Sequence, residues 1–342
     1  LMGLFGEVSF GEKGRSQRED REAEELFSKD TLANILPYKA YDDETGVFIN
    51  KGSLGFVIEA TPLIGADDAT QKEITSIFQD VMEEGSSVQC LLWADHRISK
   101  FLNMWGGVHE GRSSEFFKTL IAKRVAFFEG KRDFSPRIFR FIFSYSIPIQ
   151  GEFSDVQLRR LKEVKDGILK TLSALTYAFS WDAEDFISTL DGLVNFTHSP
   201  QVVKRRWNPY ETLSSQIPTG GVLKTREQEL VWENSTEAIF RSYRVVDYPE
   251  QWTLGAMQAL IGDFFRESFK ITAPFYLHYG VHCPIQSKVE GSFWKKMQLI
   301  ENQGKSGFLL RLIPELAEEL KEYDFVRRKL NDTRFVWTQL SA

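Results

Sequence analysis

The segment Leu36–Asp67 constrains the fold more than any other part of the chain. It reads LPYKAYDDETGVFINKGSLGFVIEATPLIGAD, with an acidic turn at 41–46 and a second turn at Lys51-Gly52. Val47–Asn50 and Ser53–Thr61 are rich in β-branched and aromatic residues, which favour strands. The segment therefore predicts a β-hairpin at the start of a folded domain.

The rest of the chain alternates between helical and strand patterns. Helices are predicted at 69–84, 98–105, 113–129, 154–179, 182–195, 253–269, 289–302 and 314–330, and strands at 87–93, 138–147, 222–232, 238–247, 272–283 and 334–340. The run at 87–93 is apolar enough to be central in a sheet. Arg140, within 138–147, predicts an exposed face or an edge strand. The fold class is α+β, with mixed or antiparallel sheets flanked by helices.

The 342 residues are enough for two or more domains. Residues 1–31 read as an N-terminal segment and a charged linker. A first α+β subdomain is predicted at 32–195 and a second at 222–342. Between them, residues 196–221 form an irregular connection that is rich in Pro and Gly.

Composition and charge narrow the class of partner. The net charge of −6 argues against direct binding of nucleic acid, which normally requires a basic face. Lys204-Arg205-Arg206-Trp207 is the strongest local exception, and we interpret it as a solvated loop. Cys90 and Cys283 lie far apart within apolar runs, so we expect buried strand residues rather than a disulfide. Unpaired cysteines are typical of the reducing cytoplasm.

Membrane contact is expected to be peripheral. We find no run of the ~20 apolar residues that a spanning helix needs, and no signal-peptide pattern. The apolar N-terminal residues Leu1, Leu4, Phe5 and Val8 recur at helical spacing, although a strand or a disordered end also fits. Leaving them in water as a cluster is unfavourable. We expect these four residues to dock on a neighbouring subunit or a membrane partner.

Residues 303–307, QGKSG, are similar to the end of a phosphate-binding loop. Such a loop needs a glycine five positions before its Gly-Lys-Ser/Thr, and that position here is Leu299. The preceding residues read as helix rather than as an apolar strand. We interpret 303–307 as a helix C-terminus followed by a turn.

Neither the histidines nor the acidic turn make a convincing metal site. His278 and His282 share one face of a predicted strand beside Cys283, but two ligands are too few for zinc. Asp42-Asp43-Glu44 reads as a hydrated turn. We therefore predict no catalytic, cofactor-binding or metal-binding residue, and interpret the chain as an assembly or recognition module. Two alternatives stay open: an enzyme built around these histidines and the acidic turn, and a free-standing assembly adaptor.

The Leu36–Asp67 segment resembles the start of the N-terminal domain of TraC-type proteins from F-type conjugation systems. That family has a Leu-Pro-Tyr start, an acidic turn before a Gly-Leu-Phe-like strand, and a Pro-Leu exit into an acidic helix start. The strand VQCLLWAD at 88–95 and the segments at 244–252 and 273–275 resemble the family too. The likeness covers most of residues 32–342.

The resemblance implies an N-terminal docking and oligomerisation domain of a conjugative type IV secretion ATPase, involved in pilus assembly and plasmid transfer. Such proteins are cytoplasmic hexamers seated at the inner membrane and contact its secretion components. ATP and Mg are then expected only in a separate RecA-like motor domain, which we expect to be missing from this chain. The resemblance gives no transported substrate and no contact surface, and it carries no catalytic residue onto residues 1–342.

Overall fold

The structure is a computed structural model. It describes residues 32–63, 67–110, 114–129, 137–195, 205–218, 221–233, 237–243, 271, 273–304, 321–323, 325–326, 328 and 336–341. The apolar residues Leu1, Leu4, Phe5 and Val8, the charged linker, the helix predicted at 253–269 and the 244–252 segment lie outside these ranges. The described part is an α+β fold with antiparallel sheets, as the sequence predicts.

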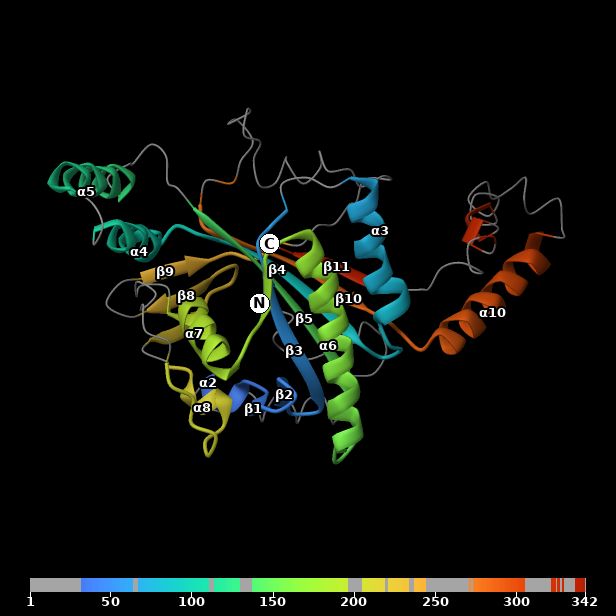
Figure 1. Cartoon of the computed structure of the whole chain (residues 1–342). Helices are drawn as coiled ribbons and strands as arrows, with labels where there is room; N and C mark the ends of the chain where they lie inside the picture. The colour runs from blue at the N-terminus through green and yellow to red at the C-terminus, as the bar shows by residue number, and fades with distance from the viewer. Residues whose placement is uncertain are drawn as a thin grey trace.

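A large antiparallel sheet forms the centre of the fold (Figure 1), in the strand order β1-β2-β3-β5-β4-β10-β11. The short strand β6 pairs with the end of β3. The bounds are Tyr38–Asp42 (β1), Val47–Asn50 (β2), Ser53–Ala60 (β3), Ser87–Asp95 (β4), Ile138–Pro148 (β5), Ala178–Ser180 (β6), Phe275–His282 (β10) and Trp337–Ser341 (β11). The predicted β2–β3 hairpin is confirmed, with Asn50 opposite Ser53.

Helices cover both faces of this sheet. On one face, α6 (Asp155–Leu175) runs along the strands with α3 (Asp68–Ser76) beside it (Figure 1), and a π-helical turn at Ile77–Val81 follows α3. Buried side chains of β3, β5 and α6 form the core there. On the other face, α7 (Ala183–Val194) and the short α8 (Leu213–Gln216) build a second core. Burial on both faces makes β3, β4 and β5 the inner strands.

The remaining elements lie around this body. They are α2 (Leu32–Ile35), α4 (Ser99–Glu110), α5 (Glu115–Glu129) and α10 (Gln286–Gly304), with a separate three-stranded sheet of β7 (Val222–Thr225), β8 (Leu230–Glu233) and β9 (Glu237–Phe240). Strands β10 and β11 follow the predicted connection at 196–221, yet they extend the sheet begun by 32–195. The two segments therefore share one sheet, and their division into subdomains stays a prediction.

Three details of the sequence reading were wrong. The helix predicted at 154–179 ends at Leu175, because residues 178–180 pair with β3 as strand β6. The strand predicted at 222–232 is broken by a turn in which Arg226 and Glu229 exchange backbone hydrogen bonds. Strand β1 was not expected, because its residues YKAYD carry no clear alternation.

The prediction that Arg140 lies on an exposed face or an edge strand was also wrong. Strand β5 lies between β3 and β4, and Arg140 points under α7. Its guanidinium makes a bidentate ion pair with Glu59 of β3, both N–O distances being 2.6 Å, and donates to Thr189 of α7 at 3.1 Å. The Trp181 indole also donates to Glu59, at 2.9 Å. A charge at this position is tolerated because every partner group is provided.

Removing one member of this pair should be costly. Arg140→Met leaves the half-buried Glu59 carboxylate without its cation, so we expect the free energy of unfolding in urea to fall by about 1–3 kcal/mol. The double variant Glu59→Gln/Arg140→Met should recover most of that loss, because the amide oxygen still accepts from Trp181 without a charge. A double variant as unstable as Arg140→Met would contradict this account.

The acidic turn between β1 and β2 is fastened to α6. Gly46 has φ +69, a left-handed conformation that favours glycine. A Cβ at Gly46 would lie 2.2 Å from Nζ of Lys165, which is buried and donates to the Thr45 carbonyl at 2.6 Å. Desolvation lowers the pKa of Lys165. Lys162 donates to the Glu44 carbonyl at 3.1 Å. The turn therefore requires glycine for two separate reasons.

Gly46→Ala and Gly52→Ala form a matched pair. Gly52 also has a positive φ, +88, but a Cβ there meets no atom within 4 Å. Gly52→Ala should lower the free energy of unfolding only by the left-handed strain of about 1–2 kcal/mol. Gly46→Ala should lose more, because Lys165 must also move. Equal losses in urea titrations would show that Lys165 does not restrict the turn.

Candidate interaction surface

Helices α4 and α5 form a hairpin inserted between two adjacent central strands. β4 ends at Asp95 and β5 begins at Ile138, and the hairpin projects beyond the end of the sheet, at the upper left of Figure 1. Within the described part of the chain, the two helices pack mainly against each other. The backbone of Gly106 lies close to α5, since a Cβ there would be in van der Waals contact with Cγ2 of Ile121, at 3.5 Å.

Each helix of this hairpin has apolar residues on two sides. Ile121, Val125 and Phe128 are partly buried on the side of α5 that includes the Gly106 contact. Other large side chains of the pair are exposed to solvent, with Phe116 the most exposed at 72%. We define the hairpin surface as these exposed residues: Phe101, Met104, Trp105, Phe116, Phe117, Leu120 and Phe127. A helix that is apolar all round normally lies against another molecule or a core.

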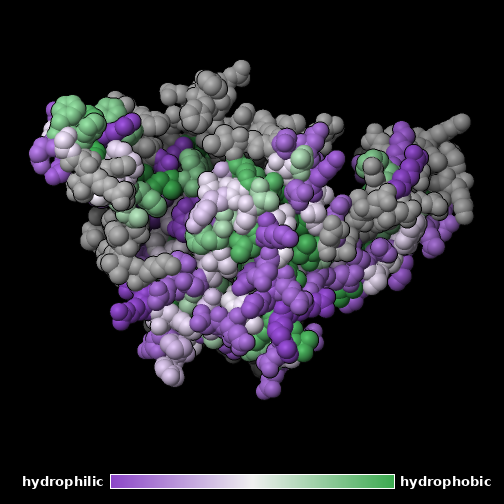
Figure 2. Space-filling model, in the orientation of Figure 1, coloured by the Kyte–Doolittle hydropathy of each residue, from purple (hydrophilic) through white to green (hydrophobic). Residues whose placement is uncertain are grey.

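Arg124 joins the exposed sides of the two helices. Its guanidinium carbon lies 5.9 Å from the ring centre of Trp105 on α4. Phe117, Leu120 and Phe127 lie within one sector of α5 around Arg124, because they are separated from it by seven, four and three residues. Phe101 and Trp105 are likewise neighbours at i and i+4. The aromatic residues of both helices therefore form one continuous surface, and Figure 2 shows apolar colouring gathered at this end of the molecule.

The sequence predicted these helices but not their exposure. Along the helix predicted at 113–129, the apolar residues make up one broad face with flanking cations. In the structure that face is divided between α4 and solvent. The sequence signal that could have predicted this exposure is the width of the apolar arc of α5. That arc is too broad for a helix that packs against one partner.

The histidines of β10 lie within the large sheet, beside β4 and β11. His282 Nδ1 lies 2.9 Å from the Ser87 hydroxyl, and Cys283 is fully buried in the core. Among the described residues, no group of three or more His, Cys, Asp or Glu side chains is arranged to hold a metal ion. His278 Nε2 is buried without a hydrogen-bond partner in that same part, and desolvation lowers its pKa.

The acidic turn and the basic loop have structural partners. The Asp42 carboxylate accepts from the Thr45 backbone amide at 3.1 Å and from its hydroxyl, closing the turn. Arg205 pairs with Asp191 of α7 at 3.1 Å, and the Trp207 ring packs edge-on to Tyr41. Lys204 lies outside the described residues.

The loop that is similar to a phosphate-binding loop is described only at its start. Residues 303–304 are the last two of α10, so the predicted helix before them is confirmed. Lys305–Gly307 lie outside the described residues.

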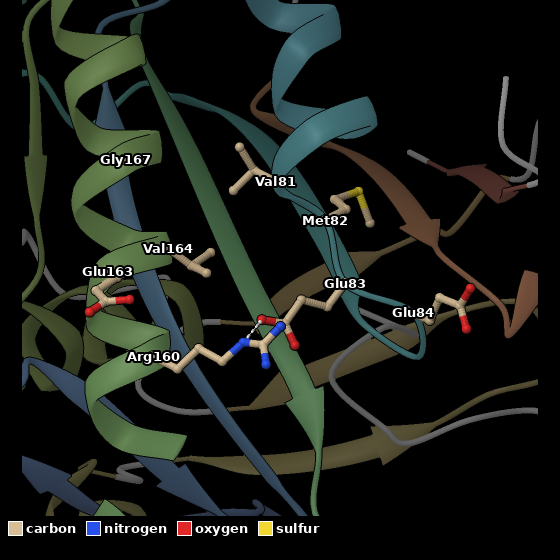
Figure 3. A pocket seen from close by; sticks show the side chains of 8 residues that line it. All are labelled: Val81, Met82, Glu83, Glu84, Arg160, Glu163, Val164 and Gly167. Carbon is tan, nitrogen blue, oxygen red and sulfur yellow. Dashed lines mark hydrogen bonds and ion pairs between the residues drawn. The ribbon is translucent and has the colours of Figure 1, made fainter. Parts of the chain in front are cut away.

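Two cavities border the large sheet. One, of about 750 Å³, lies between α6 and the segment after α3. Figure 3 shows Arg160 reaching across it to Glu83, with an Nε–Oε1 distance of 2.7 Å. The other, of about 510 Å³, lies on the α7 side, with Ser144, Ser146 and Ser87 among its lining residues. Among the described residues that line them, neither brings together the nucleophile, base and orienting group that acyl transfer requires.

The described part is thus an α+β fold from which an aromatic helical hairpin projects. A family model described as TraC protein matches residues 32–341. The chain belongs to the TraC family, which supports a role connected with conjugative transfer and type IV secretion. None of the described helices is long and apolar enough to cross a membrane.

One relative shows how much of a full-length family member this chain covers. The chain is 23% identical over 322 residues to the protein TraC of Escherichia coli strain K12. The alignment covers 87% of this chain and 36% of that protein. The chain therefore spans about a third of the length of this relative.

The packing of the hairpin can be tested with neighbouring glycines. Gly106→Leu places a side chain between α4 and α5, whereas Gly107→Leu extends from a position with no atom within 4 Å of its Cβ. Overpacking costs about 1–3 kcal/mol, so amide hydrogen exchange across 99–129 should become about tenfold faster or more in Gly106→Leu. Gly107→Leu should leave exchange unchanged. Similar exchange in the two variants would mean that α4 and α5 do not depend on this close contact.

Proposed function

We propose that this chain is the N-terminal docking and oligomerisation domain of a conjugative type IV secretion ATPase. In this proposal it attaches the motor domain to the inner-membrane components of the secretion channel. The observation that carries this proposal is the hairpin surface, which presents seven large apolar side chains to solvent on a chain of the TraC family. Contiguous apolar patches of this kind mark interaction sites. The proposed setting is the cytoplasmic side of the inner membrane, in contact with components of the secretion channel.

A second exposed surface suits self-association. The small sheet β7–β8–β9 exposes Val222, Leu223 and Ile239 by about half or more of their areas. These residues lie on β7 and β9, the outer strands of that sheet. Outer strands leave backbone groups available for pairing with another chain. This surface is our candidate for contacts between subunits of a hexamer.

The chain acts in this proposal without its own catalysis. ATP and Mg are assigned to a RecA-like motor domain in the longer protein, where pilus assembly and plasmid transfer are driven. Leu1, Leu4, Phe5 and Val8 keep their predicted role as an additional docking segment. They lie outside the described residues, so this role stays a prediction.

Expression of the chain in donor cells that carry the matching conjugative system tests the proposal. A platform without a motor should occupy the docking positions of the complete ATPase and lower the frequency of plasmid transfer. The same chain should copurify with the complete ATPase. The control is a variant truncated before β10, which lacks two strands of the sheet and should accumulate poorly and leave transfer unchanged. Normal transfer in cells that accumulate the intact chain would falsify the proposal.

Two alternative functions give different results. ATP hydrolysis by the purified chain that is lost in Lys305→Ala would indicate an enzyme, as would stoichiometric zinc that is lost in His282→Ala. Transfer that proceeds with this chain alone and needs no longer protein would indicate a free-standing adaptor.

A further inference from the structure

The hairpin region differs in charge from the rest of the chain. Residues 99–133 contain seven Lys and Arg against four Asp and Glu, a net charge of +3 in a chain whose net charge is −6. Lys123 and Arg124 are exposed on α5. By helical spacing, Lys123 lies next to Phe116 and Phe127, and Arg124 next to Phe117 and Leu120. Exposed cations therefore border the apolar hairpin surface.

This combination disfavours self-pairing of the surface. A two-fold contact brings the same patch of two subunits together, so two patches that both carry exposed cations would face each other. Like charges brought together in an interface oppose association. The complementary partner is instead anionic, and it must also accept Phe, Leu and Trp side chains over a broad area.

We propose that the hairpin surface binds the headgroup layer of an anionic lipid bilayer, with α4 and α5 lying along the membrane plane. Phe, Trp and Leu enter the boundary between headgroups and acyl chains, and Lys123 and Arg124 meet lipid phosphates. Helices α4 and α5 have 12 and 15 residues, fewer than the ~20 that a helix spanning a bilayer needs, so they fit a shallow position. The inference names the partner of the docking surface in the proposed function and rests on that function.

Co-sedimentation of the 342-residue chain with lipid vesicles tests the inference. We expect binding to vesicles of equal parts phosphatidylcholine and phosphatidylglycerol, and binding at least about tenfold weaker to pure phosphatidylcholine. Rising salt should weaken the first, because it screens the cations. Phe117→Ser/Leu120→Ser/Phe127→Ser should abolish binding, and Lys123→Glu/Arg124→Glu should lower it about tenfold or more.

Matched controls lie on other exposed surfaces. Tyr210 is 95% exposed near α8, so Tyr210→Ser removes an exposed aromatic residue elsewhere and should leave vesicle binding unchanged. The folded state of each variant is checked by its melting temperature. A polarity-sensitive dye on Leu120→Cys should shift to the blue with anionic vesicles, whereas the dye on Tyr210→Cys should not. Labelling of Cys90 and Cys283 is subtracted by use of the unsubstituted chain.

The outcomes separate this inference from the proposed function. Absence of vesicle binding, or equal binding by the triple Ser variant, overturns the lipid contact. If the chain still lowers plasmid transfer in that case, the docking function stands and the hairpin binds a protein. Vesicle binding as expected, without any effect on transfer, supports the lipid contact and rejects the docking function.

Discussion

The bidentate ion pair between Glu59 and Arg140 sets how the two faces of the sheet are used. It places a charge in the middle of the sheet, on the face where α7 packs, and the Trp181 and Thr189 side chains complete its hydrogen bonds. Arg140 also lies over the ring of Trp93, at 5.1 Å from its centre. A half-buried pair of this kind is stabilising when hydrogen bonds satisfy its remaining polar atoms. Polar contacts therefore add to the apolar packing that positions α7 on the sheet.

Arg97, which follows β4, contacts the C-terminal end of α7. The guanidinium carbon of Arg97 lies 5.5 Å from the centre of the Trp93 ring, and the guanidinium forms an ion pair with Asp95. Its guanidinium donates to the Gly192 carbonyl at 2.9 Å, within the last turn of α7. A cation at a helix C-terminus donates hydrogen bonds to the free carbonyls and interacts favourably with the partial negative charge of that end. Because Arg97 follows β4 directly, this anchoring also fixes the point from which the α4–α5 hairpin leaves the sheet.

The α4–α5 hairpin is a long connection between two neighbouring strands. Strands β4 and β5 are neighbours in an antiparallel sheet, and a short turn would connect them at lower entropic cost. The chain instead uses the residues between Asp95 and Ile138 for two helices that pack mainly on each other within the described part. Their exposed aromatic residues add little to the core. Such a costly insertion is understandable if its surface is buried in an assembly or at a membrane.

The Leu36–Asp67 motif that carries the family resemblance has a structural role. Gly46 and the carbonyls of the acidic turn contact the lysines of α6, so the motif joins the first hairpin to the helix that covers the sheet. Asp42 accepts hydrogen bonds within its own turn. The motif thus takes part in the packing of the fold, and hydrogen bonds within the turn account for the position of the Asp42 carboxylate.

The sequence by itself determined the elements whose cause is local. Strand propensity and turn residues defined β2 and β3, and helical spacing gave α6, α7 and α10. The tertiary structure alone decided what depends on distant partners. Residues 178–180 are a strand because β3 offers them hydrogen bonds, and Arg140 is central because Glu59 and α7 complete its contacts. It also decided which apolar residues of α5 stay exposed, since burial is a property of neighbours that periodicity cannot supply.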